Sequence, residues 1–211
     1  MQRQYQGLPI RELGAGAGIR RSRQPQASRV TTESPALEVM TDLARVSPAT
    51  IRAQAPIEGA HEFMRSRGVR LLLVVDERDT VLGVLTAADI LGEKPTRLAV
   101  ERGGKRDELT VADLMTPGEL VEVVELAAVE GARIGHVMET LRRAGRQHTL
   151  VVDYEHVAPR SALERPVERP MVRGIFSLSQ VARQLGVAVP QPGEVARTFA
   201  EIEAEMDSRQ E

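Results

Sequence analysis

The sequence predicts a mixed α/β (α+β) fold made of two copies of a β-α-β-β-α unit, and an internal repeat is the main observation behind this. An amphipathic pattern, a glycine and an apolar run occur twice in the same order, with Gly68 and Gly145 at an offset of 77 residues. A Gly-apolar-apolar-[Thr/Ser] motif follows each run, at residues 83–89 and 174–180, with an offset of 91. Because units of this size bury too little surface alone, we expect a pseudo-twofold pair.

The first copy is predicted to contain a strand, a helix, a hairpin and a second helix. We expect a short strand at residues 49–53 and then an amphipathic helix that ends at Gly68. Leu71–Val75 is an apolar run too short for a helix, and residues 81–85 form the second strand after a charged turn. Thr86 is placed to cap the helix that follows.

The second copy follows the same order but carries an insertion. We expect a strand at residues 120–124 and a helix that ends at Gly145, with an apolar stripe of Ile134, Val137, Met138 and Leu141. The difference between the two offsets places an insertion of 14 residues in the second hairpin. The insertion falls within roughly residues 154–170, which hold three prolines and many charges, so we expect a solvated loop, or else a partner-docking loop, and no central strand.

The repeat divides the chain into five segments. Residues 1–34 contain six Arg and two Glu and are expected to form a flexible basic arm. The arm is expected either to be surrounded by solvent or to contact an acidic partner. Residues 35–92 form the first repeat, residues 93–108 a charged linker, and residues 109–186 the second repeat. Residues 187–211 are expected to form an acidic helix that packs on its own domain or on a partner subunit, with the apolar stripe Val195, Phe199, Ile202 and Met206.

Composition excludes several classes of function. The 211 residues include 42% hydrophobic residues and only 2% aromatic residues, which argues against stacking on single-stranded nucleic acid. A net charge of −2 provides no general attraction to nucleic acid or membranes. No apolar run has the roughly 18 residues of a membrane span, and no apolar signal sequence is present at the N-terminus. We therefore expect a cytoplasmic protein with no membrane partner.

Residues suited to catalysis or metal binding are scarce. The chain has no Cys, which excludes disulfides, thiolate metal sites and a Cys nucleophile. Its four histidines show no metal-ligand spacing, and no nucleophile or pair of buried carboxylates stands out; the histidines are His61, His136, His148 and His156. We therefore expect neither an enzyme nor a metal site.

The ordered motifs resemble one family. A Met-Thr pair near the start of each copy, an amphipathic helix, a strand that ends in Val-Val-Asp and a Gly-apolar-apolar-[Ser/Thr]-x-x-Asp motif are similar to the cystathionine-β-synthase (CBS) domain. Over residues 35–186 the chain resembles a tandem CBS pair, also called a Bateman module. The resemblance implies a regulatory module that binds an adenine nucleotide or a related ligand and forms a flat homodimer.

The resemblance implies a nucleotide-binding site around the motif of the first copy. In the family, the Thr or Ser of this motif contacts phosphate and its Asp accepts hydrogen bonds from ribose hydroxyls, which points to Thr86 and Asp89. Free N–H groups at a helix N-terminus suit phosphate, and a carboxylate suits a vicinal diol. The alternative is a capping box, in which the same two residues only start the helix.

Further residues complete the expected first site. Apolar Ile51 and Leu71 are expected to line an adenine slot, Thr50 to add polar contacts, and Arg70 to neutralise phosphate.

The second copy differs at the ribose position. Ser177 and Gln180 are expected to form a capping box, because Gln serves well at the third helical position. A Gln amide has only one acceptor oxygen and no charge, so it suits a ribose diol less well than Asp does. We therefore expect a second site that is weaker or empty.

Two functions remain open from the sequence. In the first, the chain is a stand-alone regulatory module that requires no cofactor, binds AMP, ADP, ATP or S-adenosylmethionine, and passes its state to a regulated protein of unknown identity. In the second, the paired repeats form a structural or adaptor dimer that binds no ligand. Its tails or insertion loop then recruit partners.

Overall fold

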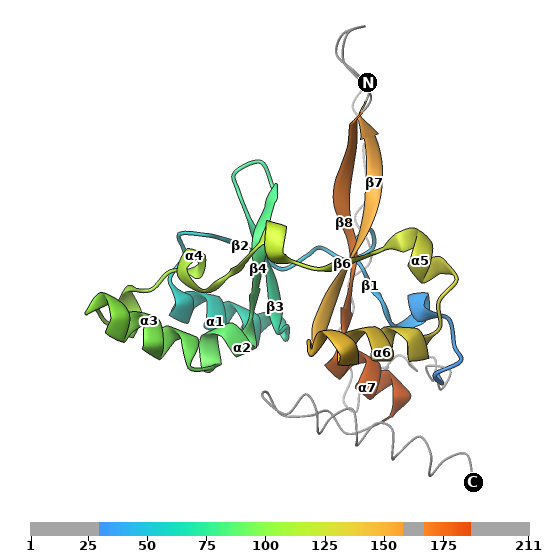
Figure 1. Ribbon diagram of the computed structural model, residues 1–211, viewed down its shortest axis with the longest axis horizontal. Helices are drawn as coiled ribbons and strands as arrows, with labels where there is room; N and C mark the ends of the chain where they lie inside the picture. The colour runs from blue at the N-terminus through green and yellow to red at the C-terminus, as the bar shows by residue number, and fades with distance from the viewer. Residues whose placement is uncertain (1–29, 158–166, 187–211) are drawn as a thin grey trace, which may run out of the picture.

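Two four-stranded sheets form the centre of the molecule, and the computed structural model describes them within residues 30–157 and 167–186 (Figure 1). In each sheet one strand pair is parallel and the others are antiparallel. The first sheet has the order β2 (Thr50–Arg52), β3 (Leu71–Val75), β4 (Val81–Thr86) and β5 (Thr116–Pro117). The second has the order β1 (Thr41–Asp42), β8 (Val167–Ser177), β7 (His148–Val157) and β6 (Val123–Glu125).

Helices accompany each sheet, and with them the sheets define two halves of the molecule. The first half contains α1 (Ile57–Arg67), α2 (Ala87–Leu91), α3 (Lys94–Arg102), η2 (Arg106–Glu108), α4 (Val111–Leu114) and η3 (Gly118–Leu120). The second contains η1 (Ala36–Val39), α5 (Leu126–Glu130), α6 (Ile134–Ala144) and α7 (Leu178–Leu185). The predicted α/β class and the pair of repeated units are confirmed.

The repeat extends to details of the backbone. Gly68 and Gly145 end α1 and α6 with φ angles of 66° and 60°, the left-handed conformation that glycine adopts without strain. Both hairpins carry an irregularity at the same place, between Val74 and Val75 and between Val151 and Val152. The predicted strand at Leu71–Val75 is confirmed at both of its ends.

The two repeats exchange their first strands. β1, from the start of the first repeat, pairs with β8, and β5, from the start of the second repeat, pairs with β4. The neighbouring apolar residues follow: Ala36 packs with α6 and α7, whereas Val111 packs with α1. The repeats of the sequence are therefore still those predicted, at residues 35–92 and 109–186. The two halves of the structure differ from them, because each half contains the first strand of the other repeat.

The sheet faces opposite the helices pack against each other. Their contact is an apolar cluster with buried residues from both halves: Leu71, Leu73, Val75, Val84 and Leu150. Around it lie partly buried apolar side chains from the exchanged segments and the second hairpin, including Leu43, Val121 and Val172. Each sheet is therefore covered on both faces, by helices on one and by the other half on the other.

The insertion differs from the predicted loop where the structure describes it. Residues 154–157 and 167–170 continue β7 and β8, and Tyr154 lies opposite Pro170. Together they form a ribbon that extends beyond the rest of the second sheet (Figure 1). The ribbon tolerates Pro170 because β1 and β6 end before this level, so its outer edges have no neighbouring strand there to pair with.

The segment predicted as a linker, residues 93–108, connects the two repeats, lies within the first half and contains α3. Pro95 at the start of this helix and Ala99 are buried, and the helix packs beside α2. The basic arm up to residue 29 and the acidic segment 187–211 lie outside the described residues. Over the described ranges, none of the helices has both the length and the hydropathy needed to cross a bilayer.

Candidate ligand-binding site

Thr86 and Asp89 form a capping box at the start of α2. The backbone N–H of Thr86 donates to Asp89 Oδ2 over 2.8 Å, and the Thr86 hydroxyl donates to the same oxygen over 2.6 Å. In return the backbone N–H of Asp89 donates to Thr86 Oγ1 over 3.3 Å. The same Thr-x-x-Asp arrangement occurs at Thr110 and Asp113, at the start of α4. The capping prediction is confirmed, and the box by itself does not identify a ligand site.

The first backbone N–H groups of α2 are largely used within the protein. The N–H of Ala87 donates to the carbonyl of Arg70 over 2.9 Å, and the N–H of Asp89 is held by Thr86. The helix is also only five residues long, so its dipole is small. A phosphate at this position would therefore depend on side chains more than on the helix N-terminus.

A cleft of about 310 Å³ opens between the two halves beside this helix start. From the first half, four of the residues predicted for the first site line it: Arg70, Leu71, Thr86 and Asp89. Thr50 and Ile51 do not line this cleft: they lie in β2, and Ile51 packs against the core beneath α1. The face of β2 that carries Ile51 turns toward the helices, so Ile51 lies apart from this cleft, and its place in an adenine slot stays a prediction.

The second repeat supplies most of the remaining lining of the cleft. Thr116, Val121 and Glu122 line it from the exchanged segment, and residues 145–150 line it from the end of α6 and the start of β7. Pairing of β5 with β4 places Thr116 opposite Val84, close to Thr86. Sequence reasoning missed this wall, although the 77-residue offset carries a signal for it, because 145–150 correspond to 68–73 in the first repeat.

The cleft has both cationic and anionic side chains. Arg70 lies on one wall and Arg146 on the other, and Arg146 pairs with Glu122 at 3.4 Å on the exposed rim. His148 lies between the walls, where burial and then the charge of Arg70 lower its pKa from 6.5 to about 4. At neutral pH the cleft therefore presents two guanidinium groups, two carboxylates and an uncharged imidazole.

The predicted second site falls on a smaller cleft of about 160 Å³. Ser177 and Gln180 line it together with Thr41, but the expected capping box is wrong. The Ser177 side chain makes no capping bond to the helix, and its Oγ lies 3.0 Å from Ser179 Oγ. Gln180 Oε1 instead accepts a hydrogen bond from the Thr41 hydroxyl over 2.8 Å, because the exchanged strand β1 brings Thr41 beside α7.

The two clefts are neighbours. Arg70, Leu71 and His148 line both of them, because the starts of β3 and β7 meet near the pseudo-twofold axis. A ligand that displaces one of these side chains in the larger cleft therefore changes the smaller one as well. Across residues 30–157 and 167–186, no group of three His, Asp or Glu side chains could hold a metal ion.

Comparisons with known proteins agree with this architecture. Residues 36–95 match the CBS domain family. An uncharacterized conserved protein from Pyrococcus horikoshii has a similar structure, with 18% identity and a TM-score of 0.51 over 77% of this chain and 99% of that one. A CBS-domain containing protein from Agrobacterium tumefaciens shows 17% identity and a TM-score of 0.48, over 72% and 94% of the two chains. The structure of CBSX2 of Arabidopsis thaliana in complex with AMP shows 20% identity and a TM-score of 0.45, over 71% of this chain and 94% of that one. Among curated protein sequences, none matches the chain.

Proposed function

The chain is a CBS-domain protein whose second half repeats the fold of the first, and on this premise we propose that it is a ligand-sensing regulatory module. Its ligand is an adenine nucleotide or a related adenosine compound, bound in the cleft between the halves. AMP, ADP, ATP and S-adenosylmethionine are the candidates. The module performs no catalysis in this proposal, and a partner protein reads the bound state.

The observation that carries this proposal is the chemistry that meets in one cleft of about 310 Å³. That volume lies at the lower end of the range for small-molecule sites, about 300 to 1,000 Å³. Leu71, Val84 and Val121 offer an apolar surface for a base, while Arg70 and Arg146 offer charge for phosphate.

Asp89 is the residue suited to the ribose. Both acceptor contacts of the capping box fall on Oδ2, so within the described part of the chain Oδ1 remains available to accept from a hydroxyl. Because the cap already fixes the side chain, the carboxylate would lose little conformational freedom on binding.

The site would transmit its state through the contact between the halves. A ligand that touches Asp89 on one wall and Arg146 on the other interacts with both halves at once. It shifts an equilibrium between arrangements of the halves only as far as it prefers one arrangement. A partner that binds one arrangement better would then sense the ligand.

Calorimetric titration of the full chain with the four candidate ligands tests the proposal. Asp89→Asn keeps the shape of the side chain but removes its charge, and we expect it to weaken binding about tenfold or more. Asp113→Asn is the matched control, since Asp113 makes the same capping box at α4 and does not line the cleft. No heat with any ligand at millimolar concentration, or equal affinity in both variants, would contradict the site.

One observation favours a second candidate function, the recruitment of a partner protein. The ribbon of β7 and β8 extends from the body, and Tyr154 and Met171 on it are 41% and 40% exposed. In this adaptor function the ribbon binds the partner protein, and a nucleotide in the cleft has no effect on that binding. Partner capture that requires Tyr154 and is unchanged by saturating nucleotide would favour it over ligand sensing.

A further inference from the structure

A third cleft lies in the second half, away from the wall that carries Asp89. It has a volume of about 330 Å³ and opens between α5 and α6 above the sheet. Its floor includes the buried ring of Phe176, and its apolar sides include Val124 and Val137. His136, Thr140 and Thr149 are the polar side chains along it. We refer to it as the α5–α6 cleft.

The equivalent positions of the first half carry larger apolar side chains. With the 77-residue offset, Phe63 corresponds to Thr140 and Leu72 to Thr149. Leu72 is fully buried and Phe63 packs against the same core beneath α1. The second half thus has hydroxyl-bearing side chains of smaller volume at two positions where the first half is filled.

The length of the connection also differs between the halves. Four residues, 53–56, join β2 to α1, whereas eight residues, 126–133, join β6 to α6 and include α5. The small residues Ala128, Gly131 and Ala132 of this longer connection form one rim of the cleft. Phe176 and Val137 are larger than their counterparts Leu85 and Ala60, but they leave the cleft open.

Thr149 presents a polar group toward this cleft. It lies opposite Phe176 in the β7–β8 pair and two residues before Val151, and both of these side chains belong to the core beneath α6. Side chains alternate along a strand, so Thr149 faces the same layer. Its hydroxyl makes no hydrogen bond to any other residue that the structure describes, which leaves it as a donor and acceptor for a ligand.

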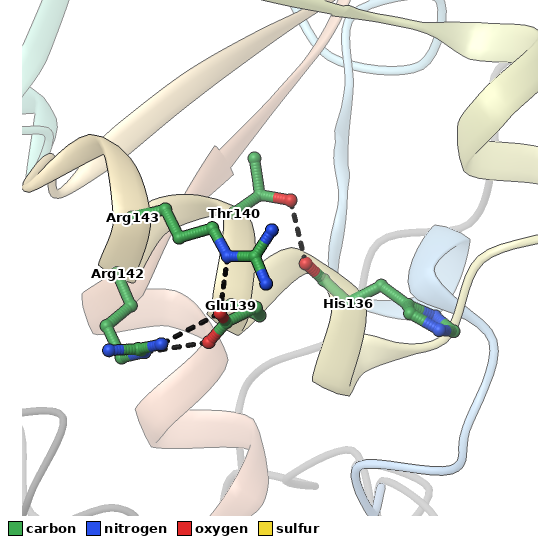
Figure 2. Close-up of polar contacts among 5 residues, drawn as sticks. All are labelled: His136, Glu139, Thr140, Arg142 and Arg143. Carbon is green, nitrogen blue, oxygen red and sulfur yellow. Dashed lines mark hydrogen bonds and ion pairs between the residues drawn. The ribbon is translucent and has the colours of Figure 1, made fainter.

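The charged residues of α6 are paired with one another. Figure 2 shows Glu139 accepting hydrogen bonds from Arg142 and Arg143, over distances of 2.6 to 2.8 Å. The hydroxyl of Thr140 donates to the carbonyl of His136 over 2.8 Å on the same helix. No Asp, Glu, Lys or Arg lines the α5–α6 cleft among the described residues. Without a compensating charge, an ionised ligand would be costly to desolvate there.

We propose that the α5–α6 cleft is a second binding site, for a small uncharged aromatic molecule that carries one hydrogen-bonding group. The ring would rest against Phe176 and the valines, and the polar group would meet Thr149. The ligand of this site would contact neither Asp89, Arg70 nor Arg146, so Asp89→Asn should leave its binding unchanged even though Thr149 also lines the larger cleft.

Indole, its hydrocarbon analogue indene and the anion indole-3-carboxylate are suitable probes for the full chain. In methyl-resolved NMR we expect indole to shift the signals of Thr140, Thr149 and Val137 and to leave those of Val84 unchanged. Indene should bind about fivefold more weakly, because it leaves the Thr149 hydroxyl unpaired. Indole-3-carboxylate should produce no shifts at the same concentration.

Two substitutions at Thr140 provide the matched pair. Thr140→Phe restores the side chain of the first half and should weaken indole binding at least tenfold, whereas Thr140→Val keeps the volume and should bind indole normally. Unchanged affinity in Thr140→Phe, or no methyl shifts with millimolar indole, would overturn the proposal. Binding that appears only when the protein is diluted would also overturn it, since the cleft would then be covered by another copy of the chain.

Discussion

His148 and Leu71 occupy equivalent positions in the two halves, yet they differ in how they respond to pH. Burial and the nearby charge of Arg70 lower the pKa of His148 to about 4, below the 6.5 of an ordinary histidine. Between these two values the unfolded chain binds a proton that the folded chain does not bind. The contribution of His148 to the free energy of unfolding is therefore complete above pH 6.5 and is lost as the pH falls from 6.5 toward 4.

We predict that the protein is about 1 to 2 kcal/mol less stable at pH 5 than at pH 7 because of this histidine. His148→Leu, which copies the first half, should remove most of that difference. Urea unfolding at both pH values measures it. Glu139 does not titrate in this window, since Arg142 and Arg143 hold its pKa at about 2. If both proteins lose the same stability, the burial of His148 is not responsible.

Single residues were predictable from sequence where their partners are local. Thr86 caps α2 as predicted, because the box needs only Asp89 three residues later. Gln180 has the same spacing from Ser177, but it bonds to Thr41, which lies 139 residues away. Nothing in the local sequence specifies that partner, so the capping prediction for the second repeat was wrong.

At the scale of the elements, Gly83 determines how closely an exchanged strand approaches. It lies opposite Pro117 in the pairing of β4 with β5, and a Cβ atom at this position would overlap the carbonyl oxygen of Thr116. That oxygen belongs to the backbone, so it can give way only if β5 moves.

We predict that Gly83→Ala destabilises the protein by about 2 kcal/mol or more, because it separates β5 from β4. Thermal unfolding measures the change, and hydrogen exchange at Thr116 should rise with it. Gly59→Ala is the control: it lies inside α1 with no atom near the added methyl, and should stabilise by about 0.5 to 1 kcal/mol. A neutral Gly83→Ala would show that the close approach is not required.

Elements with strong periodicity were predictable, and short or exchanged elements were not. α6 and β3 carry long apolar patterns, and both were found where expected. α5 has only five residues and is too short to produce a recognisable period. The exchange of β1 and β5 depends on pairing between distant segments, so it leaves no pattern in either segment alone.

At the scale of the whole molecule, the cluster between the sheets joins two cores into one folding unit. Leu73 of β3 and Leu150 of β7 are both nearly fully buried there. Removing one of these side chains should therefore loosen both halves rather than one.

We predict that Leu73→Ala lowers the free energy of unfolding by about 3 kcal/mol and that β3 and β7 still unfold in one transition. Hydrogen exchange followed by mass spectrometry reports on the two strands separately. Met64→Ala, in the core beneath α1 alone, is a control for the size of the loss. Independent transitions for the two strands would mean that the cluster does not couple the halves.

The candidate site was predictable only on one of its walls. Arg70, Leu71, Thr86 and Asp89 lie around the larger cleft, because they belong to one repeat and share its local pattern. The opposite wall, from Thr116 to Leu150, belongs to the other repeat and comes into place only through the packing of the halves. A motif within one repeat cannot show which residues of the other will face it.

The exchanged strands also determine what would happen if the chain were cut between Gly103 and Gly104. The N-terminal piece would contain β1, but the partner strand of β1, β8, would lie in the C-terminal piece. The C-terminal piece would contain β5, but the partner strand of β5, β4, would lie in the N-terminal piece. Neither piece could complete its hydrogen bonding alone, so the two fragments would hold each other in a nicked but native complex. The peptide link between the repeats would then only raise the effective concentration of one piece near the other, and the exchanged strands would hold the pieces together.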